Sequence, residues 1–327
     1  MISKSTRNLC LSAAFAALLA ACGSAEEAAN KMAEAAGETG AAVTDAAKSA
    51  AQKAAMAAKD EAAMAAHKTK LAAVLAVQDQ KAKTRYQYRR PAKTLDFLGV
   101  TPGMKIAEAL PGGGWYSKIL IPYLGDEGAL TGIDYSLEMW PEFGGFANEA
   151  FIEKKKTWPA DWTAGAQEWR GGSKAELGAF TFGARDTAQD GSYDAVLFVR
   201  ALHNLSRFEA KGGYLTQAIA DTHALLKSGG IVGVVQHAGP ESNSDEWATG
   251  SNGYLKKSAV IAAFTAAGFE LVGDSDLNAN PADVPSESDS VWRLLPSLRG
   301  AKDDPEMGEK MKAIGESNRM TLKFMKP

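Results

Sequence analysis

The chain has 327 residues, of which 46% are hydrophobic and 23% are charged, a composition typical of globular proteins. This length suits one large domain or two ordinary ones. The formal net charge is only -3, and lysine and arginine form no stripe along the chain. These two observations argue against a broad nucleic-acid-binding surface.

The N-terminus has the pattern of a secretory signal. Lys4 and Arg7 form a short positive region, and Leu9–Ala21 is an apolar run too short to span a bilayer comfortably. The run ends in the letters LAAC, which resemble the bacterial lipobox and imply cleavage before Cys22 and acylation of that cysteine. We therefore predict a signal peptide at residues 1–21 and lipidation of Cys22. The alternative is an ordinary signal peptide with a chance cysteine.

The cysteines and the residue after Cys22 indicate a compartment. Cys10 would be lost with the signal, so Cys22 is the only cysteine of the mature chain, and the folded part has none for a disulfide, a metal site or a nucleophile. Gly23 follows Cys22, where an aspartate would favour inner-membrane retention. By resemblance to proteobacterial lipoproteins, we expect a periplasmic protein held by lipid at the outer membrane.

Residues 22–83 form an alanine-rich segment with scattered charges of both signs. Alanine is the best helix former, so a helical extension is expected. Gly37–Gly40 should interrupt it, and Thr44 or Asp45 should cap a longer helix that runs to about Gln80. Because the apolar stripe is thin and no heptad pattern is sustained, we expect a tether rather than a compact domain or a coiled coil.

The segment 84–327 reads as one α/β domain. Short apolar runs between turn residues alternate with helical patterns, which predicts a doubly wound, mostly parallel sheet with helices on both faces and right-handed crossovers. Predicted strands are Met104–Ala109, Ala129–Ile133, Ala179–Gly183, Ala195–Val199, Ile231–Val235, Phe269–Gly273 and Arg319–Phe324, and predicted helices are Trp115–Tyr123, Phe208–Lys227 and Leu255–Ala267.

Two long segments interrupt this alternation, at 136–178 and 276–316. Long insertions in a compact domain are usually functional or disordered, and the tryptophans in these two argue for packing. We favour caps over the site, and the alternative, that these tryptophans only extend the core, is about equally supported. The tryptophans are Trp140, Trp158, Trp162, Trp169 and Trp292.

A glycine-rich turn follows the first predicted strand. In an open parallel sheet, ligands bind beyond the carboxyl ends of the strands, at the point where the strand order reverses. Pro111–Gly114 lies at such an end, and its glycines allow the backbone to approach a ligand beside a helix N-terminus. Asp134 ends the second strand, where a carboxylate can accept hydrogen bonds from ribose hydroxyls.

Two cofactors fit this turn. The spacing of Gly112, Gly114 and Ser117 is near the dinucleotide pattern, with serine in the third glycine position. S-adenosylmethionine instead has a ribose and an ammonium group. Glu108, at the end of the first strand, is well placed for that ammonium group but would repel a pyrophosphate. The charge argument favours S-adenosylmethionine.

Further segments resemble the class I S-adenosylmethionine-dependent methyltransferases. The chain is similar to a bacterial family of predicted methyltransferases with a PGGGWY-type loop, over about Tyr86–Pro327. The resemblance implies a Rossmann-like sheet of seven strands whose last strand inserts antiparallel, and binding of S-adenosylmethionine by Glu108, Asp134 and the loop. The segments that carry it are PGGGWYSKIL (Pro111, Gly112, Gly113, Gly114 and onward), RALHN from Arg200, and GESNRMTLKFMKP from Gly315.

Two positions fit the resemblance less closely. Asp186 matches loosely the acid that meets the adenine amino group, and a turn aspartate is its alternative interpretation. Leu110 occupies a position where the first glycine of the loop is common. The loop could therefore contact the methionine moiety differently, and cofactor binding could be weak.

The candidate catalytic residues follow the fourth strand. His203 is the candidate base or substrate contact, with Asn204 and Arg200 beside it, and a histidine held by packing is the alternative. His237 ends the fifth strand and points to the same edge. Nothing in the spacing of the two histidines demands a metal, so none is predicted. Four other residues are weaker candidates: Tyr88 and Arg89 could close over the cofactor, and Arg293 and Arg299 could contact an anionic substrate.

Together these patterns predict a membrane-anchored enzyme that methylates a small molecule, with no nucleic-acid partner. The compartment conflicts with the cofactor, because S-adenosylmethionine is made in the cytosol. Two alternatives address this conflict: a non-catalytic periplasmic module that binds another nucleoside-like or small ligand, or an N-terminal segment that does not export the domain. An NAD-binding protein stays open as well, because of the glycine loop. The sequence specifies neither the methyl acceptor nor the oligomeric state.

Overall fold

The structure, a computed structural model, describes residues 41–301 and 303–327, with side chains from residue 48. The predicted signal peptide, Cys22 and the break at Gly37–Gly40 lie outside these residues. The chain divides into two compact units, which meet between Thr69 and Lys70 and are described separately. No helix in the described ranges is both long enough and apolar enough to cross a membrane.

The described part of the first unit is one alanine-rich helix. The helix α3 (Ala41–Ala76) runs through Thr69 and contributes its last residues to the second unit. Thr44 and Asp45 lie inside it, so the predicted cap at either residue is wrong. The helix also stops short of Gln80, because Asp79 caps the separate helix α4 (Gln80–Lys83) by accepting from Ala82 N at 2.7 Å.

The second unit begins at Lys70, ahead of the expected boundary at residue 84. Leu71, Val74 and Leu75 are buried in its core, and the Tyr86 hydroxyl donates to Leu75 O at 3.0 Å. The last turns of α3 therefore belong to the domain. The short helices α5 (Tyr86–Arg89) and α6 (Pro91–Leu98) follow α4 and lead into the sheet.

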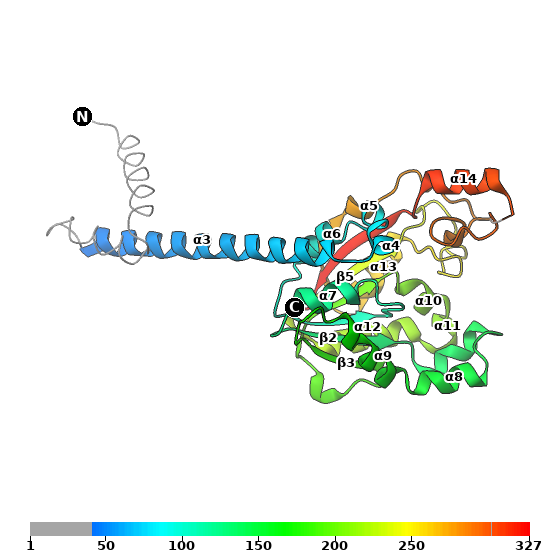
Figure 1. The fold of residues 1–327 in the computed structure, drawn as a ribbon, viewed down its shortest axis with the longest axis horizontal. Coiled ribbons are helices and arrows are strands. Elements are labelled where there is room, and N and C mark those ends of the chain that lie inside the picture. The colour runs from blue at the N-terminus through cyan, green and yellow to red at the C-terminus, as the bar shows by residue number, and fades with distance from the viewer. Residues whose placement is uncertain (1–40, 302) are drawn as a thin grey trace. The chain divides into compact units, whose positions relative to one another are not determined.

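The sheet has seven strands in the order β3-β2-β1-β4-β5-β7-β6. Figure 1 labels β2, β3 and β5 of this sheet. Strands β1 to β5 pair in parallel, and β7 pairs antiparallel with β5 on one side and β6 on the other. The predicted doubly wound sheet with an inserted antiparallel last strand is confirmed. The strands are β1 (Lys105–Ala109), β2 (Ala129–Asp134), β3 (Glu176–Thr181), β4 (Tyr193–Val199), β5 (Leu226–His237), β6 (Glu270–Ser275) and β7 (Arg319–Met325).

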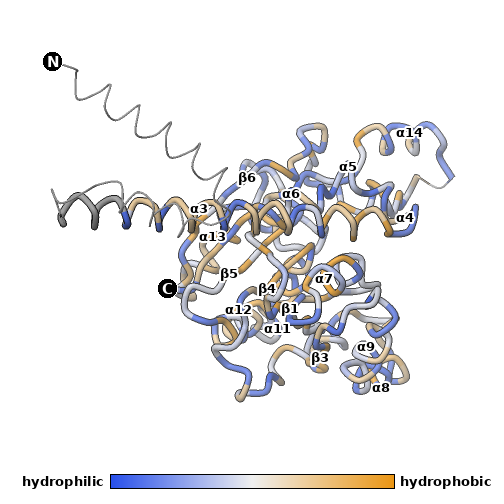
Figure 2. The backbone as a smooth tube through the Cα atoms, turned by 60° about the vertical axis from the view of Figure 1, so that its left-hand side comes forward, coloured by the Kyte–Doolittle hydropathy of each residue, from blue (hydrophilic) through white to orange (hydrophobic). Residues whose placement is uncertain are grey.

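Helices cover both faces of this sheet, as the alternating pattern predicted. Side chains alternate along β1, so that Ile106 joins one hydrophobic cluster and Ala107 the other. The first cluster includes residues of α6, α7 (Ser117–Leu124) and α9 (Trp158–Ala166), and the second includes residues of α12 (Tyr214–Leu225) and α13 (Lys257–Ala266). Figure 2 shows hydrophobic residues along β5 and α7.

Three predicted elements are wrong in their bounds, and one of them is the fifth strand, which begins at Leu226 and not at Ile231. The third strand begins at Glu176, because β3 pairs with β2 from that residue onward. The single helix predicted over 208–227 is divided into α11 (Glu209–Gly212) and α12, and it ends at Leu225 because Leu226 already belongs to β5. The division falls at Gly213, whose φ of +66° is the left-handed conformation that glycine adopts without a steric penalty. The helix α10 (Leu202–Arg207) precedes this range and was not predicted.

The first insertion is part of the core. It contains α8 (Glu149–Lys156) and α9. The Trp162 ring packs so closely on β2 that a Cβ atom added to Gly132 would lie only 2.9 Å from it. Trp140 is buried in the cluster on the other face. For these two tryptophans the core interpretation is correct. The later insertion contributes the helix α14 (Pro305–Ile314).

The contact between Trp162 and Gly132 gives a stability prediction. Gly132→Ala should lower the free energy of unfolding by about 1–3 kcal/mol, because the added methyl group overlaps the indole ring. Urea denaturation measures the change. Gly178→Ala on the adjacent strand β3 is the control, since its Cβ would meet only Thr131 Oγ1, at an ordinary 3.7 Å. Equal effects of the two substitutions would contradict this packing.

Candidate active site

The strand order reverses between β1 and β4, which makes the carboxyl ends of these two strands the expected binding crevice. Leu110 and Arg200 are the first residues after β1 and β4, and both have positive φ, +53° and +59°. This conformation costs a non-glycine residue about 1–2 kcal/mol. Such strain persists where the surrounding structure requires it and is common at functional sites, so the pair marks this crevice as the candidate site.

The glycine loop at this crevice has room and free donors for a ligand. Leu110 already has the left-handed conformation that a glycine would favour, and its N–H donates to Ile133 O at 2.7 Å. Gly112 and Gly113 are exposed, no atom lies within 4 Å of a Cβ built on Gly113, and their N–H groups have no acceptor in the described part of the chain. Pro111 is buried and closes the turn, because its carbonyl accepts from Gly114 N at 2.9 Å.

An aromatic side chain covers the end of the loop. The Trp169 ring lies 2.5 Å from where a Cβ on Gly114 would be, so only glycine fits there. Trp169 belongs to the short helix η2 (Gln167–Trp169) of the first insertion, and the Lys118 ammonium group lies 5.3 Å from its ring centre. This insertion therefore forms one wall of the candidate site as well as part of the core.

Glu108 lies beneath the loop and is almost fully buried, with 4% of its surface exposed. The Ser117 hydroxyl donates to Glu108 Oε2 at 2.6 Å. Burial raises the pKa of Glu108 to about 7, although the hydrogen bond from Ser117 favours the charged form. The carboxyl group is thus about half protonated at neutral pH. Its repulsion of a pyrophosphate is correspondingly weaker than the sequence argument assumed.

Asp134 ends β2, at the position expected for a ribose-binding acid, but it is buried and already has a partner. Lys155 Nζ lies 2.8 Å from Asp134 Oδ2 and 4.1 Å from the centre of the Trp140 ring. Burial raises the pKa of Asp134, and Lys155 partly offsets that rise. Sequence reasoning missed Lys155, because it is one of three lysines at the end of α8 and only the folded chain shows which of them turns inward.

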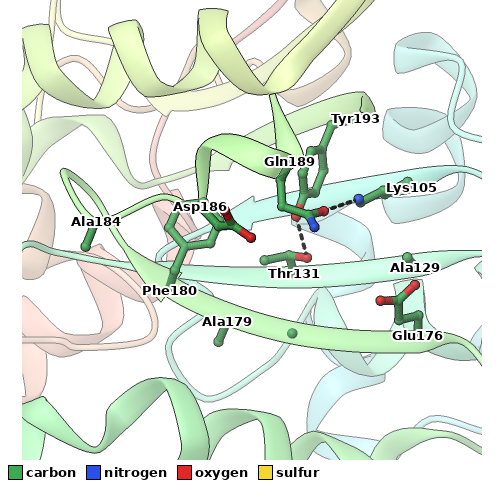
Figure 3. Close-up of a pocket in the computed structure, with 11 residues that line it drawn as sticks. Lys105, Ala129, Thr131, Glu176, Ala179, Phe180, Ala184, Asp186, Gln189 and Tyr193 are labelled. Atoms are coloured by element: carbon green, nitrogen blue, oxygen red, sulfur yellow. Dashed lines mark hydrogen bonds between the residues drawn. The ribbon is translucent and has the colours of Figure 1, made fainter. Parts of the chain in front are cut away.

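Asp186 is exposed and makes a local turn. Its carboxylate accepts from Ala188 N at 2.9 Å and caps the helix η3 (Thr187–Gln189), which agrees with the alternative interpretation of this residue. It also lines a polar cavity of about 240 Å³ (Figure 3). Lys105 and Tyr193, at the amino ends of β1 and β4, line the same cavity, so the cavity extends away from the glycine loop.

The two histidines lie together at the carboxyl edge. The ring centres of His203 and His237 are 5.7 Å apart, and His237 Nδ1 is 2.6 Å from Ser317 Oγ. His203 Nδ1 is buried and has no hydrogen-bond partner among the described residues. Burial lowers the pKa of His203 to about 4 and that of His237 well below its ordinary value, so both rings are neutral at pH 7. Asn204 Nδ2 donates to the Tyr135 hydroxyl at 2.9 Å.

The walls around His203 come from the later part of the chain. A Cβ on Gly250 would overlap the carbonyl oxygen of His203, and the ring centre of Trp292 is 6.2 Å from that of His203. Arg299 lies over the Trp292 ring at 5.1 Å. Arg293 instead binds Asp283 and the Tyr254 hydroxyl, both at 2.8 Å, which gives it a structural role.

Within residues 41–301 and 303–327, no cluster of three or more His, Cys, Asp or Glu side chains is arranged to hold a metal ion.

A buried ion cluster lies at the same edge of the sheet. Glu316 contacts Arg85 and Arg89 at 3.1 Å and Arg319 at 2.6 Å. Burial opposes ionisation of Glu316, but Arg319, Arg89 and Arg85 outweigh it and lower its pKa. Apart from a possible role for Arg89, sequence reasoning missed this cluster. Its only sequence signals are the spacing of Arg85 and Arg89, one helical turn apart, and that of Glu316 and Arg319.

No protein-family model and no curated protein matches the chain. Solved structures align with it at low identity. The [4+2]-cyclase SpnF aligns at 17% identity with a TM-score of 0.43, covering 73% of this chain and 80% of that chain. A SAM-dependent methyltransferase from Aquifex aeolicus aligns at 12% identity with a TM-score of 0.40, covering 78% and 97%. A TehB-like SAM-dependent methyltransferase from Corynebacterium glutamicum aligns at 13% identity with a TM-score of 0.39, covering 76% and 98%.

The buried Glu108 gives a pH prediction. Its pKa rises from 4.5 to about 7 on folding, so its contribution to stability is complete below pH 4.5 and is lost as the pH rises through 7. Compared with Glu108→Gln, the native protein should lose about 2 kcal/mol of unfolding free energy between roughly pH 5 and pH 8. Urea denaturation at several pH values measures the difference. A difference between the native protein and Glu108→Gln that does not change with pH would refute the raised pKa.

Proposed function

We propose that this protein transfers the methyl group of S-adenosylmethionine to a small-molecule acceptor at the crevice between β1 and β4. The observation that carries the proposal is the position of Glu108, the glycine loop and Asp134 along one edge of the sheet, at its switch point. The seven-stranded order with an antiparallel β7 is also the one that the resemblance to class I methyltransferases implies.

The residues of the crevice fit such a cofactor chemically. The free N–H groups of Gly112 and Gly113 and the open space beside them admit a ligand against the backbone. Glu108 can accept a hydrogen bond from an ammonium group. Asp134 can accept from ribose hydroxyls if it shares its carboxylate with Lys155. These roles rest on the positions of the side chains.

The chemistry requires alignment more than activation. S-adenosylmethionine, when bound, supplies a methyl group already activated on a sulfonium centre, so the protein has to orient the acceptor in line with it. His203 is neutral and has a free, buried Nδ1 atom. Its pKa of about 4 makes it a weak base, which suits orienting an acceptor that reacts without losing a proton first. Asn204 supports this edge through Tyr135.

The proposal includes membrane anchoring through Cys22, in the periplasm and at the outer membrane. Its support is the N-terminal sequence, with the LAAC letters before Gly23. Such a location requires a supply of cofactor outside the cytosol.

Calorimetric titration of S-adenosylmethionine into the purified full-length protein tests the proposed activity. We expect binding that Asp134→Ala weakens by about 10-fold to 100-fold, the size of a lost hydrogen bond to a charged group. Asp186→Ala is the control and should bind as the native protein does, because its exposed carboxylate faces a local turn. NAD is titrated in parallel. Binding of NAD alone would favour the dinucleotide alternative. If the folded protein binds neither ligand, the methyltransferase proposal is refuted.

Cell fractionation tests the anchoring. The native chain, expressed in a Gram-negative bacterium with labelled palmitate, should carry the label and sediment with outer membranes. Cys22→Ser should lose the label and leave that fraction. A native chain that is unlabelled and recovered with cytosolic proteins would contradict both the lipid and the compartment.

A further inference from the structure

The ion cluster around Glu316 contains more positive charge than its single carboxylate can balance. Arg85, Arg89 and Arg319 all contact Glu316, at 3.1, 3.1 and 2.6 Å. Arg200 lies close enough to Arg89 and Arg319 for their charges to lower its pKa. Four guanidinium groups against one carboxylate leave a surplus of three positive charges at one edge of the sheet.

Arg200 is the member of the cluster without a partner. Its side chain makes no hydrogen bond or ion pair with the described residues, and its Nε atom is buried. Burial, followed by the charges of Arg89 and Arg319, lowers its pKa to about 9, so the guanidinium is still charged at neutral pH. Its backbone is also held at a φ of +59°. A strained backbone conformation thus holds the unpaired guanidinium group of Arg200 beside other cations.

Buried charges in proteins are almost always paired, because desolvation without a partner is expensive. Arg200 is half-buried as a residue, but its Nε atom is buried without an acceptor and its charged neighbours include two further arginines. This arrangement points to a missing anion. The planar guanidinium group forms paired hydrogen bonds with carboxylate and phosphate groups, which identifies the kind of anion.

The location of the cluster connects it with the reacting centre. Arg200 immediately follows β4 and precedes the helix that carries His203. Arg319 pairs with His237 in the antiparallel ladder of β5 and β7. The surplus charge therefore borders the two neutral histidines, at the edge of the crevice away from Asp134.

We propose that Arg200, with Arg89 and Arg319, binds a carboxylate or phosphate group of the methyl acceptor. The substrate is then an acidic small molecule. The anion site is inferred from the cluster alone, whereas its assignment to the acceptor rests on the proposed function. The other source of the same chemistry is the carboxylate of the methionine part of S-adenosylmethionine.

Inorganic phosphate is the probe for the anion site. The melting temperature of the full-length protein is measured against phosphate concentration, with sodium chloride holding the ionic strength constant. We expect a saturable rise in the native protein and, in Arg200→Gln, at least about tenfold weaker binding. Arg207→Gln, at an exposed position on α10, is the control and should respond as the native protein does. An unchanged response of Arg200→Gln would overturn the proposal.

The same variants, without phosphate, separate a ligand-binding arginine from a structural one. Arg200→Gln should melt at the same temperature as the native protein or higher, because it removes an unpaired charge from among like charges. Arg319→Gln should melt at a lower temperature, because it removes a 2.6 Å partner of Glu316. A loss of stability in Arg200→Gln similar to that in Arg319→Gln would make Arg200 structural and would overturn the proposal.

A competition experiment identifies the source of the anion. Phosphate is titrated with S-adenosylhomocysteine at saturation, because this product retains the methionine-type carboxylate. Unchanged phosphate affinity supports the acceptor assignment. Loss of phosphate binding would place the cofactor's carboxylate in the cluster and overturn that assignment. If S-adenosylhomocysteine itself fails to bind while phosphate still binds, the proposed function fails and the anion site stands.

Discussion

The carboxylate of Glu316 holds together parts of the chain that are far apart in sequence. It pairs with Arg85 and Arg89 from the segment before the sheet and with Arg319 at the start of β7, and Arg89 and Glu316 are 227 positions apart. All four side chains are largely buried. A buried ion network of this kind contributes less to net stability than hydrophobic packing would, because each charge is desolvated. Its effect here is positional, since the same contacts fix the side of the crevice where Arg200 lies.

The architecture was predictable because its signals are local. Apolar runs between glycines and prolines identified the strands, and their alternation with helical patterns predicted a sheet covered on both faces. The antiparallel β7 followed from the resemblance instead. The errors have local causes too. Glu176 and Gly178 do not read as strand residues, so pairing with β2 alone defines the start of β3. Gly213 lies between two helical patterns that share a period, so its effect as a break was not evident.

The candidate site was predictable only where it follows from the sheet. Glu108, the glycine loop and Asp134 lie at strand ends, and the carboxyl ends of parallel strands share one edge. Their partners were not predictable, because Lys155 on Asp134 and Trp169 on Gly114 come from an insertion without a recognisable pattern. The unpaired state of Arg200 is likewise a property of the folded chain, since it depends on which acceptors fail to reach it.

The first insertion is anchored in the core and also borders the site. Trp162 packs on Gly132 within the sheet, while Trp169 covers Gly114 and Lys155 reaches Asp134. A segment anchored in this way cannot swing open as a rigid flap without exposing an indole from the core. Exchange of the proposed cofactor would then depend on rotations of individual side chains, chiefly the Trp169 ring and the Lys155 side chain. Residence times would accordingly reflect rotamer barriers and one ion pair rather than domain motion.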